Sequence, residues 1–228
     1  DQRSQEFTFH RGPIFATIVL ADEINRASPK TQSALLEVME ESRVTVDGTS
    51  HSVGEPFMVI ATQNPIEQAG TYRLPEAQLD RFLMKTSLGY PDHETTVELF
   101  SQAVTRDRSA SVSPVISAQA VAQMSALAGQ VHTDPAILAY VSRLSRRHPH
   151  VALGLSIRGG LACIRCAKVW AISQGRDHVT PDDIKDLAHP ILCHRLLLND
   201  EAQFTGVEVG RVIDELLADV AAPAHRLS

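Results

Sequence analysis

Lysine is rare in this sequence of 228 residues: it occurs only at positions 30, 85, 168 and 185, and none of the four follows a glycine. A phosphate-binding loop of the type Gly-x-x-x-x-Gly-Lys-Ser/Thr needs that Gly-Lys step, because its backbone N–H groups and its lysine hold the β- and γ-phosphates of a nucleotide. The motif is therefore missing from these residues. Any nucleotide chemistry must rest on other side chains.

Cysteine is also scarce. The chain has 3 cysteines, an odd number, which does not suit a disulfide framework and favours a reducing compartment. Fully apolar runs such as Ile18–Ala21 are far shorter than the roughly 20 residues of a membrane-spanning helix, so we expect no membrane span. A charged start followed by an apolar stretch is lacking, which predicts no secretory signal. Together these features predict a cytoplasmic protein.

An excess of positive charge is missing as well, since the net charge is −6 at pH 7. Residues 1–108 carry 10 Lys and Arg against 16 Asp and Glu, and residues 109–228 carry 11 of each. Proteins that bind the phosphate backbone of nucleic acids need a clear basic excess. A nucleic-acid partner is therefore disfavoured. The hydrophobic fraction of 43% is ordinary for a globular protein.

The first half of the chain alternates strand and helix signals. Short apolar runs at 15–21, 57–62 and 82–88 have the length of buried strands. A stretch with helical spacing follows the first run, and Asp47-Gly48 then lies between β-prone residues, as in a hairpin turn. Buried strands separated by helices are typical of a parallel α/β sheet. We therefore predict an α/β core over residues 1–108.

The second half has almost entirely helical spacing. A polar stretch of small residues at 106–114 indicates a linker before it. Thr180-Pro181 is a typical helix start, and Gly175 a typical helix stop. We predict an all-α domain over residues 109–228, with helices near 117–129, 135–147, 156–174, 181–194 and 207–220.

Polar side chains follow the first two predicted strands. Asp22 and Glu23 come directly after the first, and ligands of open α/β sheets bind at the carboxyl ends of strands. There, Asp22 could hold Mg²⁺ through water, and Glu23 could polarise a water molecule for attack on a γ-phosphate. Asn64 follows the next strand, and its amide could orient the same water. The alternatives are a solvated strand end for the two carboxylates and a plain turn at Asn64-Pro65.

Two arginines are candidates for contacts with phosphate. Arg81 lies just before the third predicted strand, where its guanidinium could reach a neighbouring subunit and stabilise a transition state, and Arg73 is a competing candidate. The alternative is an intrachain ion pair of Asp80 or Glu76 with an arginine. Arg158 lies in the first turn of a predicted helix, where a cation opposes the helix dipole. That position suggests a nearby anion, and a solvated arginine is the alternative.

Three stretches occur together in the order and spacing of a known family. IVLADEINRASPKTQSALLEVMEE, VIATQNPIEQAGTYRLPEAQLDRFL and GLSIRGGLACIRCAKVWAISQGRDHVTPDDI closely resemble MoxR-type AAA+ ATPases, and the resemblance covers essentially the whole chain. By this resemblance Asp22 belongs to the Mg²⁺ site and Glu23 activates water, as the acids of a Walker B motif. Asn64 matches sensor 1, Arg81 the arginine finger and Arg158 sensor 2.

The resemblance also implies a fold and an assembly. It matches the Asp47-Gly48 hairpin to the insertion before sensor 1, and residues 5–9 to the end of the helix-2 insertion. Residues 1–108 are then the later part of a parallel-sheet ATPase core, and residues 109–228 an all-α lid. The implied cofactors are ATP and Mg²⁺. The implied partners are further copies of the chain, with a hexameric ring expected, and a client protein such as one with a von Willebrand factor A domain, which a chaperone-like ATPase would remodel or mature.

The sequence departs from the family in three places. The P-loop, which precedes Walker B in the family, is absent, so the chain resembles an N-terminally incomplete member and we expect weak or no ATP hydrolysis. Ile157 and Arg73 stand where family members often have proline, and the second leaves open whether Arg73 or Arg81 is the trans arginine. Two other functions stay open: a non-catalytic interaction or assembly module, and a nucleic-acid motor by analogy with related helicases.

Two further patterns are better explained by packing. Cys163 and Cys166 have the spacing of a redox motif, but they fall inside a predicted helix and lack a second pair. His189, Cys193 and His194 could suggest a metal site, but the sequence offers no fourth ligand. We therefore predict helix packing for both groups and no metal site among them.

Overall fold

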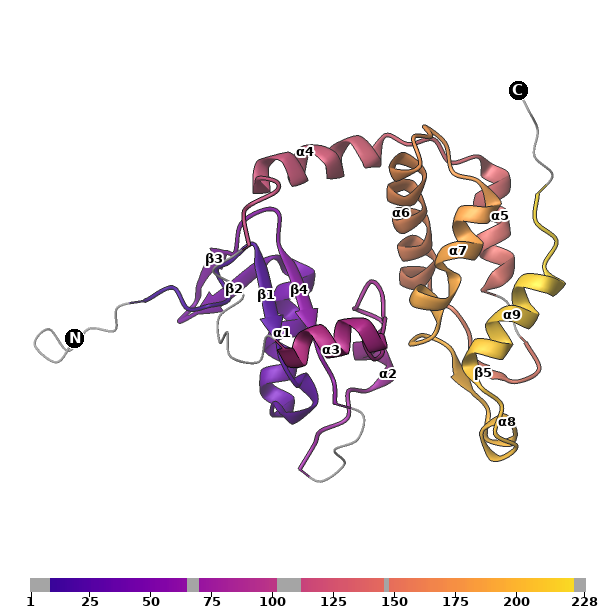
Figure 1. Cartoon of the computed structure of the whole chain (residues 1–228), viewed down its shortest axis with the longest axis horizontal. Coiled ribbons are helices and arrows are strands. Elements are labelled where there is room, and N and C mark those ends of the chain that lie inside the picture. The colour runs from indigo at the N-terminus through magenta and orange to yellow at the C-terminus, as the bar shows by residue number, and fades with distance from the viewer. Residues whose placement is uncertain (1–8, 65–69, 102–111, 146–147, 224–228) are drawn as a thin grey trace, which may run out of the picture.

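The computed structural model describes residues 9–64, 70–101, 112–145 and 148–223. Figure 1 shows an α/β part, coloured indigo to magenta, beside a helical part, coloured orange to yellow. Helix α4 (Ala118–Gly129) runs between them and packs against α6 (Ile157–Ser173) of the helical part. Within the described ranges, no helix has the length and hydropathy that crossing a membrane requires.

The centre of the α/β part is a pair of parallel strands. β1 (Ile18–Ala21) and β4 (Met58–Ala61) pair in register, from Ile18 with Met58 to Ala21 with Ala61. This confirms the parallel α/β fold, with strands shorter than the predicted runs. Parallel strands need a long connection. Here it consists of the 3-10 helix η1 (Ile24–Arg26), α1 (Pro29–Glu41) and the antiparallel strands β2 (Arg43–Val46) and β3 (Thr49–Ser52).

The two faces of this strand pair differ in burial. On one face, Ala21 and Ala61 pack against a small apolar core formed by Ile24, Leu36 and Leu74. The other face carries large apolar side chains that are between 43% and 66% exposed: Ile18, Leu20, Met58 and Ile60. The prediction that both strands are wholly buried is therefore wrong for the described residues, because α1 covers one face only.

Local signals set the ends of α1 and of the hairpin. The Ser28 hydroxyl accepts a hydrogen bond from Thr31 N at 3.2 Å, and Pro29 occupies the first helical position. The hairpin turns at Asp47 and Gly48, whose φ angles are 49° and 77°. A two-residue type I′ turn requires positive φ at both positions, which Gly and Asp tolerate better than most residues. The predicted hairpin is therefore confirmed.

The third predicted strand, 82–88, is not formed. After α2 (Glu76–Leu79) the chain is irregular, and its backbone bonds the helical part instead of a neighbouring strand. The carbonyl oxygens of Phe82 and Leu83 accept hydrogen bonds from the Arg195 guanidinium at 2.6 and 3.1 Å. The apolar run is therefore a segment that contacts the helical part. A side chain of that part, and not a neighbouring strand, supplies the hydrogen bonds to the carbonyl groups of Phe82 and Leu83.

The helices predicted in the second half are present, close to their predicted bounds. They are α4, α5 (Pro135–Leu144), α6, α7 (Pro181–Leu192) and α9 (Val209–Asp219), and α3 (His93–Ser101) precedes them. The structure adds the short α8 (Asp200–Phe204) and an antiparallel pair, β5 (Val151–Leu153) with β6 (Leu197–Leu198). The second half is therefore not purely helical. Most of the predicted linker at 106–114, and residues 5–8 of the predicted insertion, lie outside the described residues.

The helical part has its own apolar core, centred on α6 and α7. Small residues line the buried side of α6, among them Ala162, Cys163, Cys166 and Ala167. Burial raises the pKa of the Cys163 thiol to about 12, so the thiol stays protonated and packs as an apolar group. This placement agrees with the prediction that the two cysteines pack within a helix.

One buried carboxylate links the two ends of the α6–α7 connection. Thr180 and Asp183 form a capping box at the start of α7, and Arg176 donates to both carboxylate oxygens of Asp183, at 2.7 Å to Oδ2. Burial alone would raise the pKa of Asp183, but the hydrogen bonds from Arg176 and Thr180 outweigh it, and this pKa lies below its usual value. Asp183 is therefore a charged anchor of the helical part.

We expect Asp183→Ala to lower the free energy of unfolding by about 3 kcal/mol, because it removes the partner of a buried ion pair and a helix cap. Urea denaturation followed by circular dichroism measures the change. Asp182→Ala is the matched control, since the Asp182 side chain is 79% exposed on the same turn. Equal effects of the two substitutions would contradict the role given to Asp183.

Candidate functional site

Side chains from the ends of β1 and β4 meet at one edge of the strand pair. The Thr62 hydroxyl donates to Asp22 Oδ1 at 2.5 Å and accepts from Glu23 N at 2.9 Å. A backbone hydrogen bond from Ile24 N to Thr62 O, at 3.0 Å, extends the contact. The structure thus brings both predicted carboxylates to the strand end that leads to Asn64.

Thr62 is a site residue that the sequence analysis missed. It enters the prediction only as the last residue of the run 57–62. The signal that could have found it is a hydroxyl at the end of an otherwise apolar strand, two positions before a candidate amide. Its role becomes clear only when the two strands are paired, because both of its partners lie about 40 residues earlier in the chain.

Glu23 has an unusual backbone. Its φ and ψ are 49° and 52°, a left-handed conformation that costs a residue with a side chain on the order of 1 kcal/mol. Thr62 holds the Glu23 N–H, and Arg26 Nη1 lies 3.2 Å from Glu23 Oε2. The Glu23 side chain is 38% exposed, so water reaches the carboxylate. Strain of this kind concentrates at functional sites.

Asn64 is partly buried at the same edge. Asn25 Nδ2 donates to Asn64 O at 3.4 Å, which ties the end of β4 to η1 just after Glu23. Asn64 therefore lies at the edge where β1 and β4 end, and its role stays a prediction. The rest of the turn predicted at Asn64-Pro65 falls outside the described residues.

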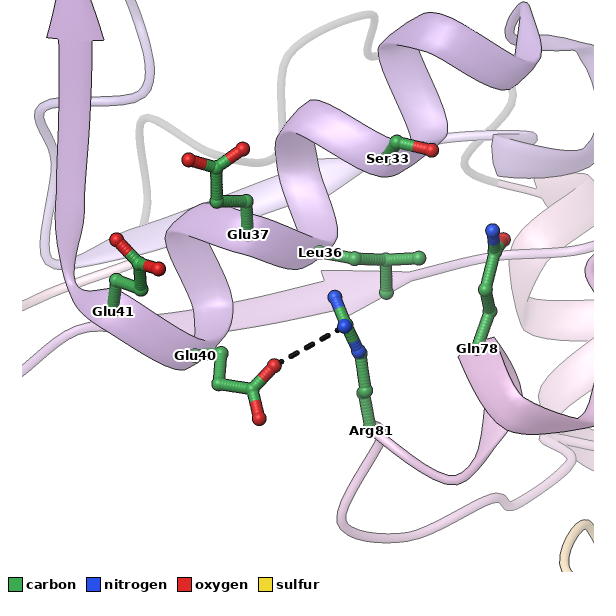
Figure 2. A pocket seen from close by; sticks show the side chains of 7 residues that line it. All are labelled: Ser33, Leu36, Glu37, Glu40, Glu41, Gln78 and Arg81. Carbon is green, nitrogen blue, oxygen red and sulfur yellow. Dashed lines mark ion pairs between the residues drawn. The ribbon is translucent and has the colours of Figure 1, made fainter.

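The two candidate arginines form a second group, at the end of α1. Arg81 Nη2 lies 3.3 Å from Glu40 Oε2, and Arg158 forms an ion pair with Oε1 of the same carboxylate. Figure 2 shows Arg81 pointing toward Glu40. Both side chains line an open hollow of about 300 Å³, together with Leu36 and Gln78. The side chains of Arg81 and Arg158 are 33% and 44% exposed. A single acidic side chain thus holds two cations side by side at the surface.

The carboxylate group and the arginine group lie at opposite ends of α1. Asp22 and Glu23 precede its start, where the Gln32 side chain bonds Ile24 O, whereas Glu40 is in its last turn. A helix of 13 residues is about 20 Å long. Within one chain, therefore, neither arginine reaches the carboxylates. Arg158, predicted to bind nucleotide, lies with Arg81 and not with Asp22.

Arg73 lies close to η1 and the first turns of α1, through the contacts of its neighbour Tyr72. Its neighbour Tyr72 donates its N–H to Asn25 O at 2.6 Å, and Tyr72 O accepts from Gln32 at 2.9 Å. Arg73 is exposed. It is therefore on the carboxylate side of α1, while its competitor Arg81 is on the far side.

The predicted alternative for the Arg81 segment, an intrachain ion pair, holds for Asp80. Its Oδ1 accepts from Arg195 Nε at 2.9 Å, and its Oδ2 accepts from the Ser156 hydroxyl at 2.9 Å. Both partners belong to the helical part. Sequence analysis missed Arg195, because no motif surrounds it and its acceptors lie more than 100 positions away.

The residues considered as metal ligands in the sequence are engaged elsewhere. His189 Nε2 lies 2.8 Å from Asp214 Oδ1, and His194 Nε2 lies 2.9 Å from Phe82 O. Among the described residues, no group of three or more His, Cys, Asp or Glu side chains is arranged to hold a metal ion by itself. A cation at Asp22 would therefore need further ligands from water or from a bound phosphate.

Comparisons with known proteins agree with this architecture. The family described as ATPase family associated with various cellular activities (AAA) matches residues 1–84, and the AAA lid domain matches residues 143–216. A solved structure from Cytophaga hutchinsonii is 36% identical, covers 98% of this chain and superposes with a TM-score of 0.89. The fold and these matches define an AAA+ ATPase core followed by its lid.

Two curated relatives narrow the class. The uncharacterized protein YeaC of Bacillus subtilis is 44% identical over 98% of this chain, and Chaperone MoxR1 of Mycobacterium tuberculosis is 38% identical over 97% of it. The chain belongs to the MoxR family of AAA+ ATPases. It spans 71% of the length of YeaC, 62% of MoxR1 and 72% of the solved structure. The division into 1–108 and 109–228 stays a prediction.

The contact of His194 with Phe82 O, in the Arg81 segment, makes the stability of the protein depend on pH. Burial, foremost, and the nearby cations Arg195 and Lys85 lower the pKa of His194, although its hydrogen bond to Phe82 O and the Asp80 carboxylate act in the opposite direction. Below the unfolded value of 6.5, the unfolded chain takes up a proton that the folded chain resists. Stability is therefore full above that pH and falls as the pH decreases.

We expect the free energy of unfolding to fall by up to about 1.4 kcal/mol per pH unit below 6.5 through this group. Urea denaturation at pH 7.5, 6.5 and 5.5 measures the slope. His194→Gln is the control, because its amide can still donate to Phe82 O but does not titrate, and the remaining histidines are common to both proteins. Parallel slopes in the two proteins would show that His194 is not responsible.

Proposed function

We propose that this chain carries the water-activating acids and the trans-acting arginines of an ATPase that hydrolyses ATP with Mg²⁺ in a ring of identical subunits. The observation that supports this most strongly is the separation of the two groups along α1. Asp22 and Glu23 lie at one end, and Arg81 and Arg158 at the other. In a head-to-tail ring, one subunit would offer its acids where the next offers its arginines.

The ligand chemistry at Asp22 suits Mg²⁺. Mg²⁺ takes oxygen ligands and keeps several waters, so it is usually bound by one or two carboxylates together with phosphate oxygens. Asp22 is exposed, and the Thr62 hydroxyl fixes one of its carboxylate oxygens at 2.5 Å. Asp22 would hold the ion through water, with Thr62 orienting the carboxylate. When bound, the ion would neutralise phosphate charge.

Glu23 is the candidate general base. Thr62 holds its backbone, its carboxylate is open to water, and its partner Arg26 is on the surface. A carboxylate so placed can accept a hydrogen bond from a water molecule and align it for attack on a γ-phosphate. Asn64, tied to the same edge through Asn25, would orient that water from the other strand.

Arg81 is the better candidate than Arg73 for the trans arginine. Arg81 lies on the side of α1 that is remote from its own carboxylates, which is the side that a neighbouring subunit would have to meet. Arg158 shares its counter-ion, Glu40, and so would act beside it. An arginine that stabilises the transition-state charge can raise the rate by about 10³ to 10⁵. To reach a phosphate, both must leave Glu40.

The 228 residues by themselves are expected to hydrolyse ATP weakly or not at all. They contain no Gly-Lys step, so the main grip on the β- and γ-phosphates is not among them. Tests of turnover therefore need a form of the protein that also contains a Gly-x-x-x-x-Gly-Lys-Ser/Thr segment. We call it the P-loop-containing form.

The expected biological role is chaperone-like. One relative is named a chaperone, and movement of the lid against the core would convert hydrolysis into work on a client protein. We propose a hexameric ring in the cytoplasm and a client with a von Willebrand factor A domain. Sedimentation of the P-loop-containing form with ATP and such a domain tests both the ring and the client.

In the P-loop-containing form, we expect Glu23→Gln to lower kcat at least about 100-fold while ATP still binds, because only the water-activating carboxylate is lost. Steady-state hydrolysis and equilibrium binding of a fluorescent ATP analogue measure the two effects. Unchanged turnover would contradict the role of Glu23.

A mixing experiment tests the trans arginine. Arg81→Ala and Glu23→Gln subunits are each expected to be nearly inactive alone. Mixed in equal amounts, they should regain activity, because roughly a quarter of the interfaces then join an intact Glu23 to an intact Arg81. Arg73→Ala, mixed in the same way, is the control and should be active by itself. If the mixture stays inactive, Arg81 does not act across the subunit boundary.

A further inference from the structure

The segment that carries Arg81 is gripped by the lid. The side chain of Arg195 is 2% exposed, and its Nη atoms donate to Asp80 O at 3.2 Å, to Phe82 O at 2.6 Å and to Leu83 O at 3.1 Å. A second pair of contacts supports it, from His194 Nε2 to Phe82 O and from Lys85 N to Pro190 O at 2.8 Å. The core holds the same segment through apolar packing of Leu79 and Phe82 and through the exposed Arg81–Glu40 ion pair.

The Asp80 carboxylate joins this grip to the start of α6. One oxygen accepts from Arg195 Nε and the other from the Ser156 hydroxyl, each at 2.9 Å. Ser156 is also the N-cap of α6, since its oxygen accepts from Gly159 N at 3.0 Å. Arg158 lies in the first turn of that helix. Asp80, the residue before Arg81, therefore links the Arg81 segment to Ser156, the N-cap residue two positions before Arg158.

The sequence makes room for this arrangement at one position. A Cβ atom on Gly159 would lie 2.9 Å from Arg195 Cδ and 2.3 Å from Leu155 Cδ1. Real Cβ atoms do not approach other atoms so closely, so a side chain at position 159 would push the stem of Arg195 away from α6. The glycine allows the guanidinium to pass behind the first turn and reach Asp80.

The chemistry of the grip favours arginine over other residues. A guanidinium is planar, stays charged and has five N–H donors in a fixed arrangement. Here those donors meet acceptors on three residues of the segment, Asp80, Phe82 and Leu83, and also Ile191 O at 2.5 Å. Lysine has three donors on a flexible stem and would hold fewer of these acceptors at once.

We propose that Arg195 and Asp80 are positioning residues for the trans-acting arginines: they lock the Arg81 segment to the first turn of α6, so that Arg81 and Arg158 move with the lid as one unit. This inference rests on the proposed function for the role of the two arginines, but the mechanical lock itself does not. With this lock, the position of one subunit's lid, and not that of its sheet, would determine when both guanidinium groups reach the phosphates of the neighbouring subunit.

Amide hydrogen exchange of the 228-residue chain tests the lock without any nucleotide. In Arg195→Met we expect the amides at 80–83 and that of Lys85 to exchange at least about 10-fold faster, because the carbonyl groups of Asp80, Phe82 and Leu83 lose their donor in the lid and the segment opens more often. Arg176→Met is the matched control: it breaks a buried ion pair of the lid that does not touch this segment. Unchanged exchange at 80–85 in Arg195→Met would overturn the proposal.

A second variant guards against a general loss of folding. Arg195→Lys keeps a buried cation but holds fewer acceptors, and we expect an intermediate rise in exchange that is confined to 80–85. Circular dichroism checks that the helices of both variants are intact. A rise spread evenly over the lid in Arg195→Lys, equal to that in the control, would show a structural role only and would overturn the proposal.

A double-mutant cycle in the P-loop-containing form tests the consequence for turnover. Arg195→Lys should lower kcat about 10-fold and leave KM within about 2-fold, because the acids and the nucleotide grip are untouched. In an Arg81→Ala background the same substitution should have no further effect on kcat. An equal loss in both backgrounds would show that Arg195 does not act through Arg81. If the unsubstituted protein does not hydrolyse ATP, the proposed function fails, while the exchange experiment still decides whether the lock exists.

Discussion

A pair of parallel strands cannot be joined by a short turn, and this constraint organises the whole α/β part. The chain must return from the end of β1 to the start of β4, and it does so along α1 and the β2–β3 hairpin. Because both strands then end at the same edge, Thr62 meets Asp22 and Glu23 there, although it lies about 40 residues later in the chain. Because α1 begins near this edge and runs away from it, residues that pack against the end of α1 lie about one helix length from Asp22 and Glu23.

Two acidic residues near the far end of α1, Glu40 and Asp80, form ion pairs that differ in how deeply they are buried. Glu40 is 45% exposed and pairs with Arg81 and Arg158, and an exposed pair of this kind contributes little to stability, so it can be exchanged for another anion at small cost. Asp80 is 17% exposed and pairs with the buried Arg195, where loss of one partner would leave an unpaired charge away from water. Glu40 can therefore release its two arginines at small cost in stability, whereas Asp80 cannot release Arg195 without leaving a buried charge unpaired.

Features governed by neighbours in the sequence could be predicted, and features governed by distant contacts could not. The turn at Asp47-Gly48 and the start of α7 at Thr180-Pro181 depend on a few adjacent residues, and each is present as expected. The run 82–88 is apolar because it forms the contact with the lid. Its composition alone does not say whether its hydrogen-bond partners come from a neighbouring strand or from the lid.

The same limit applies to the site. Asp22, Glu23, Asn64, Arg81 and Arg158 could be found because they stand in motifs, and their roles stay predictions. Thr62 and Arg195 could not, because each gains its meaning from hydrogen-bond partners that are 39 to 115 positions away. The separation of acids from arginines also needs the path of α1 in space, which the order of motifs along the chain does not contain.

The uncovered face of the β1–β4 pair has a consequence for how the chain behaves in solution. Ile18, Leu20, Met58 and Ile60 form an apolar strip on strands that, within the described residues, pair only with each other. Open strand edges beside an apolar strip are the conditions under which chains add to one another by further strand pairing. We therefore expect this strip to promote association between copies of the chain, so that dilute samples report its properties more faithfully than concentrated ones.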